Sequence, residues 1–443
     1  MRSHQSKRPV LAISAIVAIL TIVLPTDDLK SVGLVDLPRA EPEDVGMSSD
    51  RLQRIDSTMQ RYIDSNQLAG TVTLIARHGK VVHVSAQGWR HKEANQPMTP
   101  DTIFTIMSMT KPIVSTALMM LYEEGYFLLD DPISKWLPAY ENMQVSLNPA
   151  PPGRPTEPAI RPVTVRHVLT HTSGLSLQPN FRPDYLRLPA QDAVERPRTV
   201  GEAIDHAADV PLAFHPGDDW QYGASTDYVA LLVEKISGMN VQDFLEKRLF
   251  QPLGMEDTHY NVPQSKVDRV AAVYQHTGPN NSIELLRPPV YLEPNTYYGG
   301  VAGLNSTVAD YFLFQQMMLN GGELNGVRFL SPRTINLMIS NHIGDKDVYV
   351  SGPGYGWGLG YCILMDPGKA TEHLSPGTFF WTGAYNTISW VDPVEDMVAV
   401  AMTQARPFGR VNFLKDLSAV ASQAIIESHR HNPPTVMGYP IFR

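Results

Sequence analysis

β-hairpin patterns lie near both ends of the chain, and the patterns between them are mostly helical. Residues 70–84 contain two β-rich runs around a His-Gly turn, and residues 387–402 contain two more around an Asp-Pro turn. Short turns between β-rich runs are typical of hairpins. Since an isolated hairpin is only marginally stable in water, we expect the two distant hairpins to join in one sheet, with the helical region inserted between them.

A helical pattern accompanies each hairpin. Residues 49–63 carry apolar side chains three or four positions apart, and residues 414–426 follow the last hairpin as a closing helix. We therefore expect a discontinuous sheet domain made of residues 40–106 and 350–430. The segment between them, residues 107–349, is expected to form a mostly helical lobe.

Composition excludes several classes of protein. Hydrophobic residues make up 43% of the 443 residues and charged ones 18%, so the chain can bury a sizeable core and is not disordered. A formal net charge of -9 argues against a strongly basic nucleic-acid binder. The single cysteine, Cys362, excludes an intrachain disulfide and a cysteine-based zinc cluster. His167 and His171 are spaced like a metal pair, but no glutamate follows His167 as in a zincin. We expect no metal and no cofactor.

The first residues have the pattern of an export signal. Three basic residues precede an apolar run at residues 10–24, and two aspartates follow it. A positive start, a 15-residue apolar stretch and a polar exit are typical of a secretory signal, and the run is short for a membrane span. We expect residues 1–33 to be a signal peptide or an uncleaved membrane anchor. The protein would then be exported, either periplasmic or secreted, and possibly anchored by residues 10–24.

A single Ser-x-x-Lys pattern, Ser108 to Lys111, is the first candidate for chemistry. Pro112 is tolerated only in the first turn of a helix, so Ser108 should lie at a helix start with Lys111 one turn on and on the same face. A serine hydroxyl needs a neighbouring base to become nucleophilic, and a lysine can be that base or assist another. The alternative is an ordinary helix cap with a solvated lysine.

Several further segments occur in a fixed order after this pattern. Residues 163–175 read Val-Thr-Val-Arg-His-Val-Leu-Thr-His-Thr-Ser-Gly-Leu, and a Trp-Gln-Tyr segment, a Gly-Gly-Val-Ala-Gly-Leu segment and the final hairpin follow. Together they resemble the serine β-lactamase and penicillin-binding superfamily, in its class C-like branch and closest to family VIII carboxylesterases, from about residue 44 to the closing helix. The resemblance implies a β-lactamase/transpeptidase-like α/β (α+β) fold. Its antiparallel sheet would be flanked by helices, with a mostly helical lobe carrying Ser108.

The second motif of the family, Tyr-x-Asn, reads Tyr222-Gly223-Ala224 here. The resemblance gives Tyr222 the role of catalytic base, and we expect a nearby Lys111 ammonium to lower the phenol pKa. Without the other motifs, Tyr222 would be read as a core tyrosine. Ala224 lacks the family's side-chain amide. Asp227 keeps a spacing from Tyr222 that resembles family VIII esterases, and it is assigned to the substrate pocket.

Two segments compete for the third motif, Lys-Thr-Gly or His-Thr-Gly. The segment that starts at His276 matches the residue types of the motif better, but no strand pattern follows it. The segment that starts at Trp381 directly precedes the final hairpin, which is the position expected for the motif. We favour the second segment, which makes the Ala384 N–H an oxyanion donor beside the Ser108 N–H. The substrate-pocket residues implied by this choice are Trp381, Thr382, Gly383 and Tyr385. An indole in place of a cation adds apolar area and removes a partner for a substrate carboxylate.

The function expected from these residues is hydrolysis of carboxylic esters. A Ser108 acyl-enzyme would form with Lys111 and Tyr222 as the base system. The alternatives are a D-amino-acid-specific peptidase or weak β-lactamase on cell-wall-like substrates, and a catalytically silent penicillin-binding-like scaffold. The partner is a small ester or amide, with no nucleic acid, and the sequence leaves the oligomeric state open.

Overall fold

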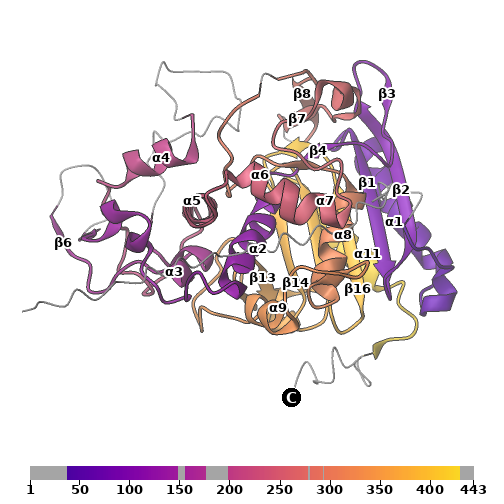
Figure 1. Ribbon diagram of the computed structural model, residues 1–443. Coiled ribbons are helices and arrows are strands. Elements are labelled where there is room, and N and C mark those ends of the chain that lie inside the picture. The colour runs from indigo at the N-terminus through magenta and orange to yellow at the C-terminus, as the bar shows by residue number, and fades with distance from the viewer. Residues whose placement is uncertain (1–36, 148–154, 176–197, 278–279, 293, 430–443) are drawn as a thin grey trace, which may run out of the picture. The chain divides into compact units, whose positions relative to one another are not determined.

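The computed structural model describes residues 37–147, 155–175, 198–277, 280–292 and 294–429 (Figure 1). The expected signal or anchor, residues 1–33, lies outside the described residues. Contacts along the chain separate Met1–Lys30 from Ser31–Arg443, and every feature below belongs to the second unit.

One antiparallel sheet combines strands from both ends of the chain, which confirms the predicted fold class. Strand β1 pairs with β16, so that Val72 lies opposite Met402, and with β2 on its other side. The sheet order is β12-β13-β14-β15-β16-β1-β2-β3. The bounds are Tyr355–Trp357, Cys362–Leu364, Phe379–Gly383, Thr387–Asp392, Met397–Met402, Gly70–Arg77, Lys80–His91 and Gln96–Pro97 in that order.

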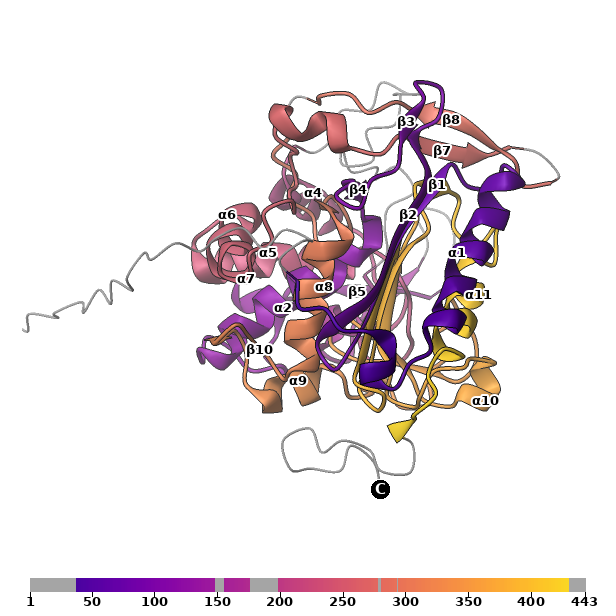
Figure 2. The same ribbon diagram turned by 90° about the vertical axis from the view of Figure 1, so that its right-hand side faces the viewer.

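Helices cover both faces of this sheet (Figure 2). On one face lie the helices α1 (Ser49–Asp64) and α11 (Phe413–Ser422), which pack against each other. On the other face lies α8 (Val308–Leu319), which packs against β1, β15 and β16. The central strands are apolar on both sides: all six residues of β16 are buried. Burial on both faces explains why this strand reads as a continuous apolar run rather than an alternating one.

The helical region between the two ends is built around α2 (Thr110–Glu123) and α5 (Ser225–Ser237), which pack against each other. The other α-helices are short: α3 Val165–Leu169, α4 Val200–Ala207, α6 Val241–Leu245, α7 Gln251–Leu253, α9 Pro332–Met338 and α10 Pro367–Ala370. Small two-stranded sheets join β4 (Phe104–Thr105) to β9 (Asn305–Ser306), β5 (Gln144–Ser146) to β6 (Thr156–Pro158), and β10 (Glu323–Leu324) to β11 (Val327–Arg328).

One part of the middle region is a sheet where we expected no strand. β7 (Val273–His276) and β8 (Ile283–Arg287) form a hairpin, and β17 (Ala405–Arg406) adds to it in parallel. The expectation that no strand pattern follows His276 was therefore wrong, because His276 is the last residue of β7 and the next strand, β8, pairs back onto it. The division into a sheet domain and a helical lobe stays a prediction.

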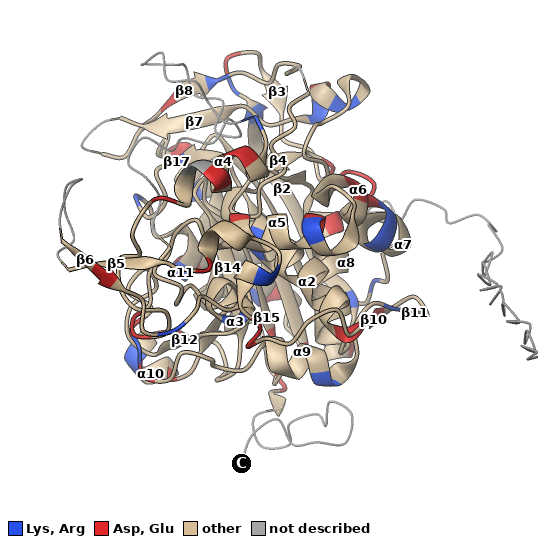
Figure 3. Cartoon of the chain, turned by 60° about the vertical axis from the view of Figure 1, so that its left-hand side comes forward, with Lys and Arg blue, Asp and Glu red and all other residues tan. Residues whose placement is uncertain are grey.

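Charged residues of both signs are interspersed over the helices and loops (Figure 3). Within the described part of the chain, no helix combines the length and the apolar character that crossing a membrane requires.

Candidate active site

The serine and lysine of the Ser-x-x-Lys pattern lie at the start of α2, as expected. Ser108 sits in a 3-10 turn, Met107–Met109, directly before the helix, and Lys111 lies in its first turn. Lys111 Nζ is 3.3 Å from Ser108 Oγ and 3.0 Å from the carbonyl oxygen of Val301. The turn begins at Met107 with φ of 50°, a conformation that is strained for a side chain of this kind. This backbone places the hydroxyl beside the amine.

The environment of Lys111 favours its neutral form. The side chain is 0% exposed, and among the residues that the structure describes no carboxylate forms an ion pair with it. Burial lowers the pKa of Lys111 to about 7, against the weaker opposing effect of Asp227. A lysine that gives up its proton near neutral pH can accept one from a hydroxyl.

Tyr222 lies next to both residues, but its pKa does not shift as predicted. Lys111 Nζ lies over the phenol ring, 4.6 Å from its centroid, and the phenol oxygen accepts a hydrogen bond of 3.1 Å from Trp381 Nε1. Burial raises the pKa of Tyr222 above its usual value, and hydrogen bonds with Ser108 and Trp381 offset only part of this rise. The expectation that Lys111 lowers this pKa was wrong, because burial of the phenol disfavours the phenolate and raises the pKa instead.

A cluster of aromatic side chains packs against the ring of Tyr222. The ring of Trp381 is 5.1 Å from that of Tyr222 and 4.6 Å from that of Trp357, and Trp220 stacks on Tyr222 at 6.2 Å. His171 completes the cluster, 5.0 Å from Tyr222. Burial, with a smaller effect of Lys111, lowers the pKa of His171 well below its usual value. The imidazole is therefore neutral, and the cluster adds no second positive charge beside Lys111.

Strand β14 brings the third motif against the turn that carries Ser108. A Cβ atom at Gly383 would lie 2.1 Å from Thr387 Oγ1 and 2.4 Å from the Ile106 carbonyl oxygen. Only a glycine permits this approach. Thr382 is partly exposed and Ala384, the next residue after the glycine, is exposed, which leaves this end of the strand accessible.

Three residues assigned to the substrate pocket are buried in packed structure. Trp381 is 5% exposed, Tyr385 4% and Asp227 2%. From the sequence we expected Trp381 to add apolar area to the pocket. Nothing in the sequence indicated that its indole N–H donates a hydrogen bond to the Tyr222 phenol oxygen. Tyr385 packs in a small cluster with Met107 and other apolar residues.

Asp227 does not face a substrate. Its carboxylate accepts hydrogen bonds from the Tyr297 hydroxyl at 2.8 Å and the Val301 N–H at 2.9 Å. The carbonyl oxygen of the same Val301 accepts from Lys111. Asp227 therefore positions the segment that binds the lysine, and its assignment to the pocket was wrong because the side chain points into the protein rather than out of it.

One residue at the site gave no signal in the sequence. Tyr349 is 58% exposed, its ring lies 5.2 Å from Trp220, and its hydroxyl accepts a hydrogen bond of 3.2 Å from the Tyr222 N–H. It belongs to a loop outside the Ser108, Tyr222 and Trp381 motifs, so only the tertiary structure brings it next to Tyr222.

The two histidines spaced like a metal pair are separated by the end of a helix. His167 caps α3 through its bond to the Thr164 N–H, whereas His171 lies beyond α3 with φ of 59°. The described ranges contain no group of three or more histidine, cysteine, aspartate or glutamate side chains suited to a metal ion.

Comparison with known proteins identifies the family. A family model described as Beta-lactamase matches residues 55–422. Protein Rv1367c of Mycobacterium tuberculosis (strain ATCC 25618 / H37Rv) is 32% identical over 386 residues, which cover 83% of this chain and 92% of that protein. Esterase EstB of Burkholderia gladioli is 29% identical over 370 residues, covering 79% of this chain and 89% of the esterase.

A solved structure agrees with these relatives. EstCE1, described as a hydrolase with promiscuous acyltransferase activity, matches with a TM-score of 0.69 and 26% identity, over 85% of this chain and 99% of that one. The chain therefore belongs to the beta-lactamase family, and it is a serine hydrolase with esterases among its relatives.

Proposed function

We propose that this protein is a carboxylesterase that forms an acyl-enzyme on Ser108. The observation that carries the proposal is the contact between Lys111 Nζ and Ser108 Oγ at 3.3 Å, in a setting where burial lowers the lysine pKa to about 7. A serine hydroxyl that is hydrogen-bonded to an amine is activated as a nucleophile when the amine is partly deprotonated at neutral pH, because the neutral amine can accept the hydroxyl proton.

The first step transfers the Ser108 proton to neutral Lys111 as Oγ attacks the ester carbonyl. The carbonyl oxygen becomes an oxyanion, which the N–H groups of Ser108 and Ala384 stabilise. The close approach of β14 at Gly383 supports this pairing of donors from two distant segments.

The second step expels the alcohol. The C–O bond to the alcohol breaks as Tyr222 donates its phenol proton to the leaving oxygen. Lys111 then transfers to Tyr222 the proton that it accepted from Ser108, which restores the phenol. A phenol with a raised pKa is suited to this relay because it stays protonated between turnovers. Water then attacks the acyl-enzyme, releasing the acid and restoring the Ser108 hydroxyl.

The site favours esters over β-lactams and peptides. The positions that would bind a substrate carboxylate or amide are occupied by Trp381 and Ala224. The indole N–H of Trp381 is already used by Tyr222, so it offers no free donor to a carboxylate. The relative Esterase EstB supports an esterase, and the description of EstCE1 as a hydrolase agrees with hydrolysis in general.

Ser108→Ala tests the proposal. We expect kcat/KM on p-nitrophenyl acetate to fall by at least about 10³-fold, since no other group replaces the nucleophile. Ser115→Ala is the matched control. Ser115 lies in α2 seven residues after Ser108, and its buried hydroxyl has no hydrogen-bond partner among the described residues, so its loss should leave activity unchanged. Full activity of Ser108→Ala, or turnover of nitrocefin or D-alanyl peptides above that of esters, would refute the assignment.

A further inference from the structure

A second concave site lies beside the segment that leads to the nucleophile. It is formed by β4 and β9, by the chain after α7, and by the residues that follow β8. Most of its lining residues are apolar, and the others are polar side chains and one arginine. The lining residues are Thr105, Tyr260, Asn261, Val262, Val267, Val270, Ala271, Arg287, Pro288, Pro289, Val290, Leu292, Asn295, Tyr297, Gly303 and Asn305.

Arg287 is the one charged side chain among the described residues that line this pocket. Across the part of the chain that the structure describes, its guanidinium makes neither a hydrogen bond nor an ion pair. A partly buried arginine without an anion is unusual, because guanidinium groups bind carboxylates through paired hydrogen bonds wherever one is within reach.

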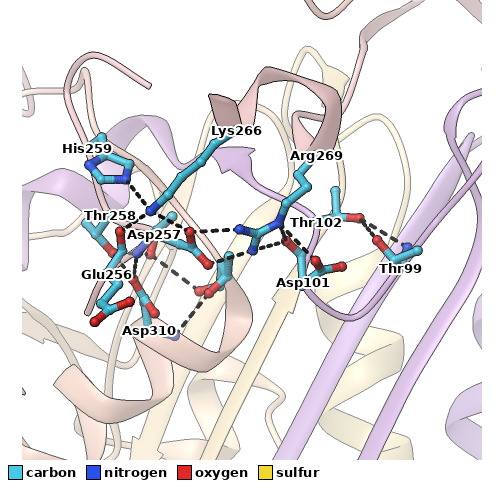
Figure 4. Close-up of polar contacts among 12 residues, drawn as sticks. Thr99, Asp101, Thr102, Glu256, Asp257, Thr258, His259, Lys266, Arg269 and Asp310 are labelled. Carbon is cyan, nitrogen blue, oxygen red and sulfur yellow. Dashed lines mark hydrogen bonds and ion pairs between the residues drawn. The ribbon is translucent and has the colours of Figure 1, made fainter. Parts of the chain in front are cut away.

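The other cations near the pocket are already bound (Figure 4). Arg269 pairs with Asp257 at 2.6 Å and with Asp101 at 2.9 Å. Lys266 pairs with the same Asp257 at 2.9 Å. Both cations belong to the 3-10 helix Gln264–Arg269, next to Val267 and Val270 of the pocket wall. Their ion pairs leave Arg287 as the unpaired positive charge among the described residues at this site.

The polar groups of the pocket wall are mostly satisfied within the protein. Asn261 donates to the Asn295 carbonyl oxygen and accepts from the Asn295 N–H, both at 3.0 Å. Asn305 donates to the carbonyl oxygen of His259. A ligand would therefore find an apolar wall with one strong unused donor group at Arg287.

The rim of the pocket exposes apolar side chains. Val290 is 49% exposed and Leu292 36%, on the same segment as Arg287 and next to two prolines. Adjacent exposed apolar residues around a concave site mark a place where an apolar ligand can be buried.

We propose that this pocket binds an apolar carboxylate, with the acid group on Arg287 and the hydrocarbon chain against the valines and prolines. The chemistry follows from charge complementarity: a neutral apolar ligand would leave the guanidinium unpaired, and a polar anion would not use the apolar wall. The proposal does not depend on the reaction at Ser108.

Two sources supply such a carboxylate. One is the free acid that ester hydrolysis releases. The other is a substrate that carries a carboxylate at the end of its chain while its ester reaches Ser108. The pocket lies near the segment that carries the nucleophile: Thr105, three residues before Ser108, is among its lining residues, and Leu286, beside Arg287, packs against the cluster of Met107 and Tyr385.

Isothermal titration with octanoate, and with octanol as the neutral control, tests the proposal. We expect octanoate to bind at least about tenfold more tightly than octanol, since a charge-assisted hydrogen bond is lost with the alcohol. Arg287→Leu should remove this difference, and Arg287→Lys should restore part of it. Arg54→Leu, which removes an exposed positive charge on α1, should leave it intact. Equal binding of both probes, or octanoate binding that survives Arg287→Leu, overturns the proposal.

Kinetics distinguish the two sources. Arg287→Leu should hydrolyse p-nitrophenyl acetate as fast as the parent protein does. The role of Ser108 is tested by Ser108→Ala on the same ester, so a failure of that assignment is distinguishable from a failure of the Arg287 proposal. If a carboxylate-tipped substrate is the source, the variant loses about tenfold in kcat/KM on the p-nitrophenyl monoester of suberic acid, and octanoate competes with that ester. If the free acid is the source, the monoester has no advantage over p-nitrophenyl octanoate, and octanoate binds without competing with p-nitrophenyl acetate.

Discussion

Two polar regions of this protein, one fully buried and one partly exposed, differ in how their charges are paired. At the start of α2, Lys111 is fully buried and bonds to a hydroxyl and a carbonyl oxygen. In the ion-pair network of Asp101, Asp257, Lys266 and Arg269, each cation contacts at least one carboxylate (Figure 4).

The pKa values follow this difference. Burial acts on Lys111 almost alone and lowers its pKa to about 7. Burial also works against the charged form of Asp257, but hydrogen bonds from Arg269 and Lys266 outweigh it and hold the pKa below the usual value. Paired charges keep their ionisation and stabilise the structure, whereas the unpaired amine becomes able to exchange a proton.

Substituting the unpaired amine tests the comparison most strongly. Lys111→Met should lower kcat/KM on p-nitrophenyl esters by about 10³-fold, because nothing else accepts the Ser108 proton. In the parent protein, kcat/KM should fall as the pH drops below about 7, where Lys111 becomes protonated. Of the titratable groups that face Lys111, His171 does not contribute to this fall because its pKa lies well below its usual value, whereas burial raises the pKa of Asp227 despite its hydrogen bonds from Val301 and Tyr297.

The same variant should gain stability at low pH. The pKa of Lys111 falls on folding from 10.5 to about 7, so the unfolded chain binds the proton more tightly. The cost of burying the lysine is therefore full below pH 7 and disappears as the pH rises towards 10.5. Urea denaturation at pH 6 and pH 10 measures this, with the exposed Lys135→Met as the control. A loss of stability in Lys111→Met at pH 6 would contradict the account.

Removing the carboxylate of the ion-pair network should lower the free energy of unfolding and leave catalysis unchanged. Asp257→Asn leaves Arg269 and Lys266 without their shared carboxylate, and we expect a loss of about 2 kcal/mol in the free energy of unfolding. Because the pKa of Asp257 is lowered on folding, this contribution is present at neutral pH and is lost below about pH 4. Asp218→Asn, in an exposed pair with Arg161, should change stability little. A shifted pH profile of kcat/KM in Asp257→Asn would show that the two regions are coupled.

The smallest effect is expected from a hydrogen bond at the phenol. Trp381→Phe keeps an aromatic ring but removes the donor to Tyr222, so kcat should fall about tenfold while KM changes little. Trp390→Phe is the control, since the N–H of the buried Trp390 has no hydrogen-bond partner among the residues that the structure describes. Equal kcat in Trp381→Phe and the parent would mean that the aromatic packing alone holds Tyr222.

Much of the fold could be predicted because its signals are local. The hairpins around β1–β2 and β15–β16 and the helices α1 and α11 follow from periodicity and turn residues. The sheet of β7, β8 and β17 could not be predicted in the same way. Its third strand is two residues long and joins from more than a hundred positions away, so no local pattern records the pairing.

The site was predicted unevenly for a similar reason. Ser108 and Lys111 share one helical turn, and the sequence fixes such a spacing directly. The contact of Tyr222 with them rested on resemblance, and its electrostatics were misjudged because burial cannot be read from a motif. Tyr349 and the Val301 carbonyl contribute through backbone and loop contacts that residue types do not reveal.

The amino-acid sequence by itself determined the order of the elements, the family motifs and the adjacency of serine and lysine, because these depend on neighbours within one or two turns. The tertiary structure decided which charges are paired and which are not. Pairing depends on distance and burial among segments far apart in the chain, and it is burial without a salt-bridge partner that lowers the pKa of Lys111 to about 7.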